Sequence, residues 1–198
     1  MKTLLCRLKT CLAAAALAAM PLQAAIAAPT FAVAAPDSVA PGASFTVQVS
    51  ALDITDLYAF QFDLTFDPAL FAASGAAEGP FLAGAGTTLF DGGAIDNAAG
   101  VISYAFGTLI GSLPGASGSG VLISFDFDAK GLAGSAGAFQ LINVIAVDSS
   151  IDTIDVAVQG SRVSIPEPAA LSLSVVALAL LGASARRRGG VGSLPRAA

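Results

Sequence analysis

Alternation of apolar and polar side chains, one residue at a time, most limits what this chain can fold into. Residues 58–67 show it best, with Tyr58, Phe60, Phe62, Leu64 and Phe66 set against Gln61, Asp63, Thr65 and Asp67. A period of two residues places successive side chains on opposite faces of a β-strand, whereas a helix requires a period near 3.6. This stretch is therefore predicted to be a strand with one face in the core.

Five further stretches have the composition and spacing of strands: 44–52, 101–107, 121–129, 139–147 and 153–160. In 101–107 the face predicted to point inward carries Ile102, Tyr104 and Phe106. Residues 139–147 are apolar on both faces, which predicts a central or covered strand.

Turn-forming segments separate these strands, among them the glycine-rich stretches 91–100 and 113–120. Only 67–71 predicts a turn of helix, with Asp67 as N-cap and Pro68 at the first helical position. Many short strands without crossover helices indicate two antiparallel sheets packed face to face, with a closed barrel as the alternative. We favour the sandwich, for which about 130 residues are sufficient.

The charge of this region excludes several kinds of function. Residues 28–165 contain thirteen acidic and two basic side chains, a net charge of −11, which opposes binding to nucleic-acid phosphates. The chain has no His, so catalysis that depends on histidine and the common zinc sites are excluded. Asp126 and Asp128 share one strand face, roughly 6–7 Å apart, but we interpret them as a solvated face rather than a glycosidase pair. No enzyme activity is predicted.

Two acidic loops offer oxygen ligands of the kind that calcium prefers. The first contains Asp91, Asp96 and Asn97, and the second contains Asp148, Asp152 and Asp155. Neither has the spacing of an EF-hand loop, so turn capping is the favoured interpretation, Ca²⁺ is the alternative, and no cofactor is assigned. The chain lacks Trp, and Tyr58 and Tyr104 are both assigned to the core, so a planar aromatic strip for glycans is not expected. Glycan binding through polar loops stays open.

Three local motifs give the region a family resemblance. They are Pro41-Gly42 before a strand, Phe66-Asp67-Pro68 followed by Phe71, and Phe125-Asp126-Phe127 in a late strand. Over residues 31–164 the chain resembles the cohesin domain, a module that grips dockerin domains in cellulose-degrading complexes. The resemblance implies an all-β, jelly-roll β-sandwich of about nine strands and a non-catalytic binding role. It transfers no ligand-contacting residue to this chain.

The N-terminus has the order of features found in a secretory signal peptide. Lys2, Arg7 and Lys9 form a basic region, residues 11–20 are apolar, and Ala25 and Ala27 put small residues at the two positions that signal peptidase reads. Cleavage by signal peptidase is predicted after Ala27, with Ala24 as the alternative. The predicted divisions of the chain are a signal peptide (1–27), a cohesin-like domain (28–164) and a C-terminal segment (165–198).

The C-terminal segment combines three unlike features in a fixed order. Pro166, Glu167 and Pro168 precede an uncharged stretch, 169–185, and a basic cluster follows at Arg186, Arg187 and Arg188. The uncharged stretch is predicted to be a transmembrane helix of roughly 25 Å, with the arginines on its cytoplasmic side. This arrangement resembles the PEP-CTERM sorting signal, at which an exosortase cleaves. A permanent membrane anchor is the alternative.

Two functional hypotheses follow. The first is an exported scaffold module that docks a dockerin-bearing protein. The second is a carbohydrate-binding matrix protein, linked to polysaccharide metabolism, in which Ca²⁺ bridges the acidic surface to exopolysaccharide. Both place the precursor transiently in the inner membrane and the product in the cell envelope or extracellular matrix, with no nucleic-acid partner.

Overall fold

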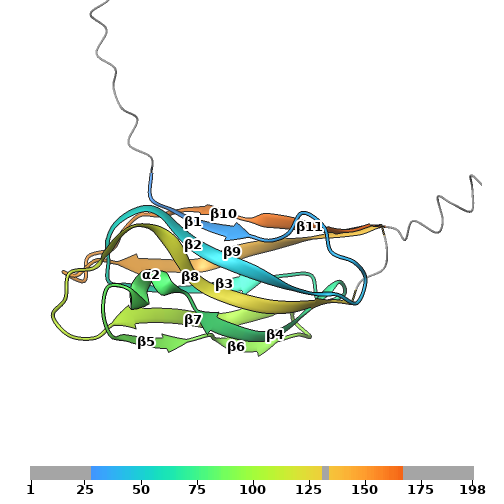
Figure 1. Cartoon of the computed structure of the whole chain (residues 1–198), viewed down its shortest axis with the longest axis horizontal. Coiled ribbons are helices and arrows are strands. Elements are labelled where there is room, and N and C mark those ends of the chain that lie inside the picture. The colour runs from blue at the N-terminus through green and yellow to red at the C-terminus, as the bar shows by residue number, and fades with distance from the viewer. Residues whose placement is uncertain (1–27, 131–133, 167–198) are drawn as a thin grey trace, which may run out of the picture.

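The computed structural model describes residues 28–130 and 134–166 (Figure 1). Two packed β-sheets make up this part of the chain, as the alternation predicts, and a single short helix, α2 (Pro80–Ala83), lies beside them. The strands are β1 (Thr30–Ala34), β2 (Ser44–Leu57), β3 (Ala59–Thr65), β4 (Phe71–Glu78), β5 (Thr88–Asp91), β6 (Ala94–Asp96), β7 (Val101–Leu109), β8 (Ala116–Ala129), β9 (Ser135–Val147), β10 (Ala157–Gln159) and β11 (Ser161–Ile165).

The first sheet has the strand order β10-β1-β2-β8-β4 and the second the order β11-β9-β3-β7-β5, with β6 also paired to β7. All but one of the pairs are antiparallel; the exception is β1 with β10. The prediction of a sandwich rather than a closed barrel is confirmed, since the described strands form two separate sheets.

The described residues contain eleven strands, against about nine predicted, because two runs are interrupted. β5 and β6 pair with successive parts of β7 and are separated by Gly92 and Gly93. β10 and β11 flank Gly160, where the chain passes from the first sheet to the second. Counting each interrupted run once gives nine.

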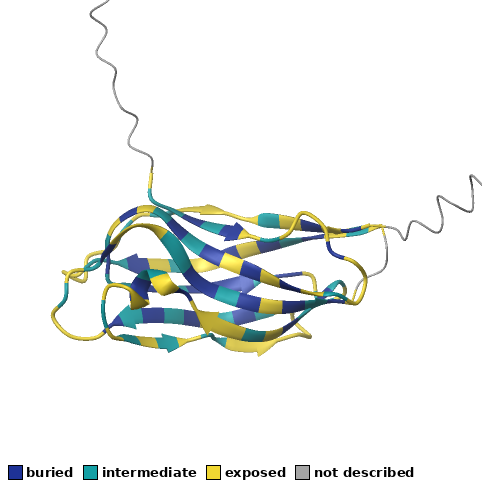
Figure 2. Cartoon of the chain, in the orientation of Figure 1, coloured by how far each residue is buried: buried dark blue, intermediate teal, exposed yellow. Residues whose placement is uncertain are grey.

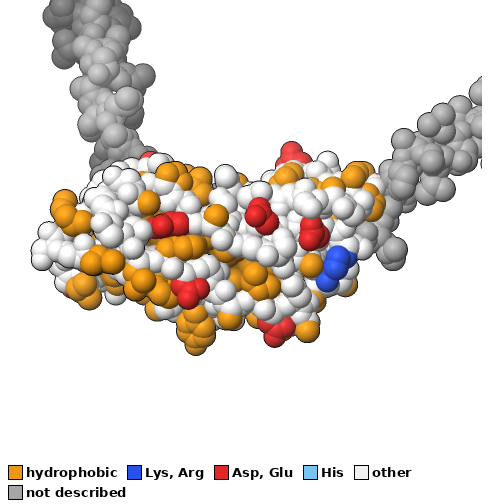
Figure 3. All heavy atoms as spheres, turned by 60° about the horizontal axis from the view of Figure 1, so that its bottom comes forward, with side chains coloured by type: hydrophobic (Ala, Val, Ile, Leu, Met, Phe, Trp, Pro, Cys, Tyr) orange, Lys and Arg blue, Asp and Glu red, His pale blue; other side chains and the backbone are white. Residues whose placement is uncertain are grey.

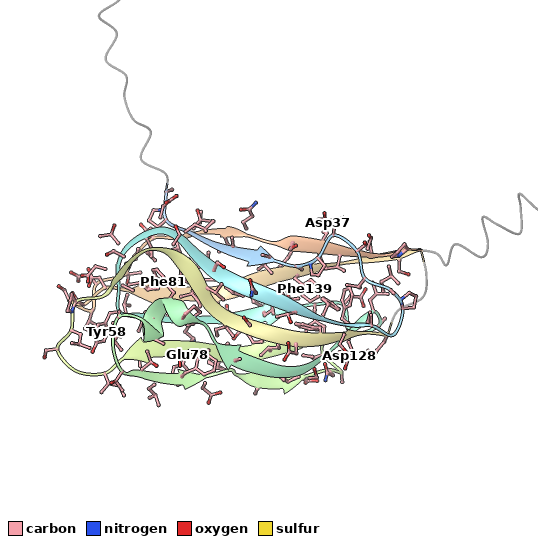
Figure 4. The ribbon with its side chains drawn as sticks, in the orientation of Figure 1. Asp37, Tyr58, Glu78, Phe81, Asp128 and Phe139 are labelled. Carbon is pink, nitrogen blue, oxygen red and sulfur yellow. The ribbon has the colours of Figure 1, made fainter. Side chains whose placement is uncertain are left out.

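The core lies between the sheets and consists largely of phenylalanine. Buried and exposed residues alternate along the long strands (Figure 2), and the rings Phe45, Phe66, Phe71, Phe127 and Phe139 form one cluster across the two sheets. Figure 4 places Phe139 inside the sandwich. The two aromatic motifs of the sequence therefore build the contact between the sheets.

The predicted turn at 67–71 is a single turn that leads into β4. The backbone N–H groups of Leu70 and Phe71 donate to the carbonyl of Asp67, and the Asp67 carboxylate accepts the N–H of Ala69. The predicted strand 153–160 is shorter than expected: only Ala157–Gln159 is a strand, and Thr153 makes an isolated bridge to Val147.

Candidate functional site

Exposed apolar side chains gather on the second sheet. Five of the eight large hydrophobic residues that are exposed in the described part lie on its strands. Leu89, Tyr104, Ile142 and Ile145 point outward, whereas Ile95 of β6 pairs with the buried Ile102 and points to the other side. We call the outer surface of β9, β3, β7 and β5 the apolar face. Soluble proteins seldom leave such side chains grouped on one surface unless the surface binds something.

Cross-strand pairing shows which side chains are neighbours on the apolar face. In one row Gln61 of β3 pairs with Ile145 of β9 and Phe106 of β7. In the next row Ala59 pairs with Val147 and Thr108. Paired residues point to the same side of a sheet.

Small Ala59 on the central strand leaves a hollow between these rows. The hollow has a volume of about 210 Å³ and is lined by Ala59, Gln61, Phe106, Ile145 and neighbouring residues. The apolar face is therefore a sheet surface with a shallow depression beside exposed aliphatic side chains. This shape suits the insertion of an apolar side chain from a partner.

The prediction that Tyr104 and Phe106 point into the core is wrong. Tyr104 is 68% exposed and Phe106 is half-buried, whereas Ile102 and Ala105 are buried. The cause is a β-bulge, because Ser103 and Tyr104 of β7 together face the single Asp63 of β3. One extra residue shifts everything after it to the opposite face of the strand.

The apolar character of 139–147 on both faces has a different meaning from the one expected. β9 lies between β11 and β3 in its sheet, and its inward residues Phe139 and Leu141 are buried. Its outward residues Ile142 and Ile145 are 44% and 50% exposed, so no described part of the chain covers them. The strand is predicted correctly, and its uncovered face is part of the apolar face.

The first acidic loop caps turns and ties the sheets together. The Asn97 amide accepts the N–H of Ala73 and donates to its carbonyl, at 2.8 and 2.9 Å, so it joins the β6–β7 turn to the edge strand β4. Asp91 accepts the N–H of Gly93, and Asp96 accepts those of Ala98 and Ala99. The Ala99 and Ala98 amides hold the pKa of Asp96 below its ordinary value.

The second acidic loop is organised in the same way. Asp148 accepts the N–H groups of Ser150 and Asp152, while Asp155 is exposed. Among residues 28–130 and 134–166, no three Asp, Glu, His or Cys side chains lie close enough to hold a metal ion. In both loops the described contacts are those of turn capping.

Asp126 and Asp128 of β8 face the neighbouring strand β2. Asp128 accepts a hydrogen bond from the Ser44 hydroxyl at 2.6 Å, and Asp126 accepts one from Thr46 at 3.1 Å. These bonds reinforce the pairing of β2 with β8, which is the contact expected of cross-strand polar pairs. Tyr58 and Asp128 lie near opposite ends of the sandwich (Figure 4).

A third carboxylate, Asp56 at the end of β2, joins two loops. It accepts the Ser149 hydroxyl at 2.7 Å and the N–H of Gly115 at 2.6 Å, so it links the segments that follow β9 and β7. The Ser149 hydroxyl, followed by the Gly115 amide, lowers the pKa of Asp56 below its ordinary value of 3.8. The sequence did not indicate a role for this residue, because its partners Gly115 and Ser149 are far from Asp56 in the chain.

Acid is expected to remove the contribution of Asp56 to stability. Because its pKa is lower in the folded than in the unfolded chain, the stabilisation is present above about pH 3.8 and is lost as the pH falls further. Urea unfolding of the wild type and of Asp56→Asn should differ at pH 7, and the difference should shrink below pH 3.8. A difference that stays constant from pH 7 to pH 2.5 would contradict this role.

Charge on the described surface is strongly acidic. Figure 3 shows acidic side chains spread along one side of the molecule, with apolar patches between them and basic atoms confined to one end. Lys130 and Arg162 are the two basic residues of 28–166. A protein partner with basic residues around an apolar centre would complement this surface.

The predicted sorting signal lies almost entirely outside the described residues. This holds for Glu167, Pro168, Arg186, Arg187, Arg188 and the apolar stretch 169–185, and also for the predicted signal peptide, 1–27. Pro166 is exposed and follows Ile165, the last residue of β11, which is buried. In the part of the chain that the structure describes, no helix has the length and apolarity needed to cross a membrane.

Solved structures share this fold at low sequence identity. A non-cellulosomal cohesin from Archaeoglobus fulgidus is 17% identical with a TM-score of 0.59, and covers 71% of this chain and 93% of its own. The sixth cohesin of Acetivibrio cellulolyticus scaffoldin B, solved with a Cel5 dockerin, is 17% identical with a TM-score of 0.57. The match covers 70% of this chain and 99% of that cohesin. A cohesin module of a Clostridium perfringens family 33 glycoside hydrolase is 12% identical with a TM-score of 0.58, covering 71% and 98%.

No curated protein sequence matches the chain. The sequence profile of the cohesin domain matches residues 29–164, which is the whole of the described sandwich apart from its terminal residues. The resemblance drawn from the aromatic motifs is thus confirmed, and the chain belongs to the cohesin domain family.

Proposed function

We propose that this protein is a non-catalytic docking module that binds a partner protein through the apolar face. The observation that carries the proposal is the row of exposed aliphatic and aromatic side chains on the second sheet, with Ile142, Ile145 and Tyr104 at its centre. Tyrosine and large aliphatic side chains form the cores of protein–protein interfaces, and polar residues form their rims.

A partner of the dockerin type fits the family. Cohesins with this fold have been solved in complex with dockerins, among them the scaffoldin B cohesin with a Cel5 dockerin and a Clostridium thermocellum OlpA cohesin with Doc918. Because these proteins are less than 20% identical to this chain, they support the fold, and the dockerin-type partner is our inference for this chain.

We infer the place of action from the motifs near the two ends of the sequence. We infer that signal peptidase removes residues 1–27 and that an exosortase recognises Pro166, Glu167 and Pro168, with Arg186, Arg187 and Arg188 on the cytoplasmic side. β11, the last described strand, ends at Ile165, and Pro166 after it is exposed, which supports access of a protease to this motif. The product would then act in the cell envelope or extracellular matrix.

One observation favours the glycan-binding alternative. Tyr104 is an exposed aromatic ring on a sheet face, and sugars commonly stack on such rings. A single exposed tyrosine offers less than the planar strip that a polysaccharide chain would use, and its neighbours Ile142 and Ile145 are aliphatic. These neighbours favour a protein partner.

A pull-down separates these functions. Residues 28–166 would be immobilised and exposed to the secreted fraction of the source organism, with and without EDTA. We expect capture of one discrete protein, with EDTA releasing it where the partner itself needs calcium to fold. Capture of polysaccharide without a protein would support the alternative, and no capture at all would contradict both.

A further inference from the structure

The apolar face contains a buried ionisable side chain, although side chains on this outer surface are expected to be exposed to solvent. Asp63 is 8% exposed and is the one buried polar or charged residue in 28–130 and 134–166. It lies on the central strand β3 between Phe62 and Leu64, which point into the core, so its own side chain points outward. A buried carboxylate is costly unless hydrogen bonds satisfy it, so its partners show what it does.

The Asp63 carboxylate bonds to both neighbouring strands. One oxygen accepts the backbone N–H of Tyr104 on β7 at 2.7 Å, and the other accepts the side-chain amide of Asn143 on β9 at 2.7 Å. One side chain thus bridges three strands across the middle of the apolar face. Hydrogen bonds to a charged acceptor are stronger than those between neutral groups.

Both partners have strained backbones. Tyr104 has φ 60° and Asn143 has φ 53°, in the left-handed region that residues other than glycine rarely adopt. Each belongs to a β-bulge: Ser103 and Tyr104 face Asp63, and Asn143 and Val144 face Phe62. Strain of this kind persists only where surrounding contacts enforce it, and it occurs most often at functional sites.

The two bulges determine which side chains the apolar face displays. The bulge on β7 leaves two successive residues, Ser103 and Tyr104, pointing outward. The bulge on β9 does the same for Ile142 and Asn143. Without the bulges, strict alternation would return Tyr104 to the core side, where the sequence pattern alone places it.

We propose that Asp63 is the positioning residue of the apolar face: its carboxylate holds the two bulges that present Tyr104 and Ile145 to a partner. The inference rests on the proposed docking function for its biological meaning. The conformational part can be measured in the absence of any partner, so the two can fail separately.

An exchange of donor and acceptor tests the proposal in the full-length chain, purified in mild detergent. Asp63→Asn replaces the charged acceptor with a neutral amide, which weakens the bonds to both the Tyr104 N–H and the Asn143 amide. Adding Asn143→Asp restores a donor–acceptor pair with the same total charge as the wild type. The control is Asp126→Asn, which alters a carboxylate on the other sheet that bonds to Thr46.

Hydrogen exchange at the Tyr104 amide is the readout that needs no partner. We expect Asp63→Asn to speed this exchange about tenfold, the double variant to restore it to within about threefold, and Asp126→Asn to leave it unchanged. Equal exchange in the wild type and Asp63→Asn would overturn the proposal. The same holds if the double variant behaves like the single one.

Binding is then measured with the protein that the pull-down isolates. Asp63→Asn should weaken binding of the partner about tenfold and lower the thermal midpoint of unfolding. In the double variant both the affinity and the thermal midpoint should return toward the wild-type values. Lower stability with unchanged affinity would show a merely structural role and overturn the positioning of the face. Should the pull-down yield no protein, the docking function fails, and the exchange experiment still decides whether Asp63 holds the bulges.

Discussion

Replacing Phe127 with Ala is expected to lower the free energy of unfolding by about 3–5 kcal/mol, because a buried phenylalanine loses its transfer free energy and leaves a cavity. Phe127 is fully buried, and its ring centre lies 5.0 Å from that of Phe139 and 5.1 Å from that of Phe66. It also stacks on Phe45 at 5.9 Å. Phe127 belongs to β8 of the first sheet and Phe139 to β9 of the second, so the substitution weakens the contact between the sheets.

Leu89→Ala is the matched control, since it also shortens an apolar side chain on a strand. Leu89 is 55% exposed, and its loss should change the free energy of unfolding by no more than about 0.5 kcal/mol. Urea unfolding followed by far-UV circular dichroism measures both variants. Equal losses in the two variants would mean that the phenylalanine cluster does not hold the sheets together.

The same cluster explains why the fold could be predicted from sequence. The inward faces of β2, β3 and β8 follow an uninterrupted period of two over their aromatic stretches, so Phe45, Phe62 and Phe125 could be assigned to the core directly. The motifs at Phe66 and Phe127 are the points where the sheets meet. Core packing requires an apolar residue at every second position of these strands, and this alternation is visible in the sequence.

Strands with weak patterns could not be located. β4 has the sequence FAASGAAE, in which alanine fits helix, strand or loop and no period is visible. Its position is set by pairing with β8 and by the amide of Asn97, and both contacts join residues far apart in the sequence. Non-local contacts of this kind leave no signal in the local composition.

The set of side chains displayed at the candidate site depends on two β-bulges that the sequence does not predict. No glycine or proline marks the change of face at Tyr104 or Asn143, and both residues take their left-handed backbone from contacts with Asp63. In the sequence Asp63 holds an ordinary polar position of the alternation, like Gln61 and Thr65, so nothing local indicates that its carboxylate is buried and bonded to both neighbouring strands. The apolar residues of β9 could be predicted, but whether anything covered them could not.

Replacing Ile145 with Asp is expected to weaken binding of the pulled-down partner about 100-fold or more, close to 3 kcal/mol, as for a central interface residue. Ile145 is 50% exposed, pairs with Gln61 and lines the hollow of about 210 Å³ on the apolar face. A carboxylate there would lose its hydration on binding and would replace an apolar contact with an unpaired charge. It would also add to the negative charge of the domain. Isothermal titration calorimetry with the purified partner measures the change.

Val158→Asp introduces the same charge at a similarly exposed β-branched residue elsewhere. Val158 is 45% exposed on β10, at the edge of the first sheet, and its substitution should change the dissociation constant less than threefold. Because both variants add one negative charge, long-range repulsion of the partner is equal to a first approximation, and the difference between them reports contact at the apolar face. If Val158→Asp abolished binding and Ile145→Asp did not, the partner would dock on the β10 edge, where added backbone hydrogen bonds rather than the hollow would hold it.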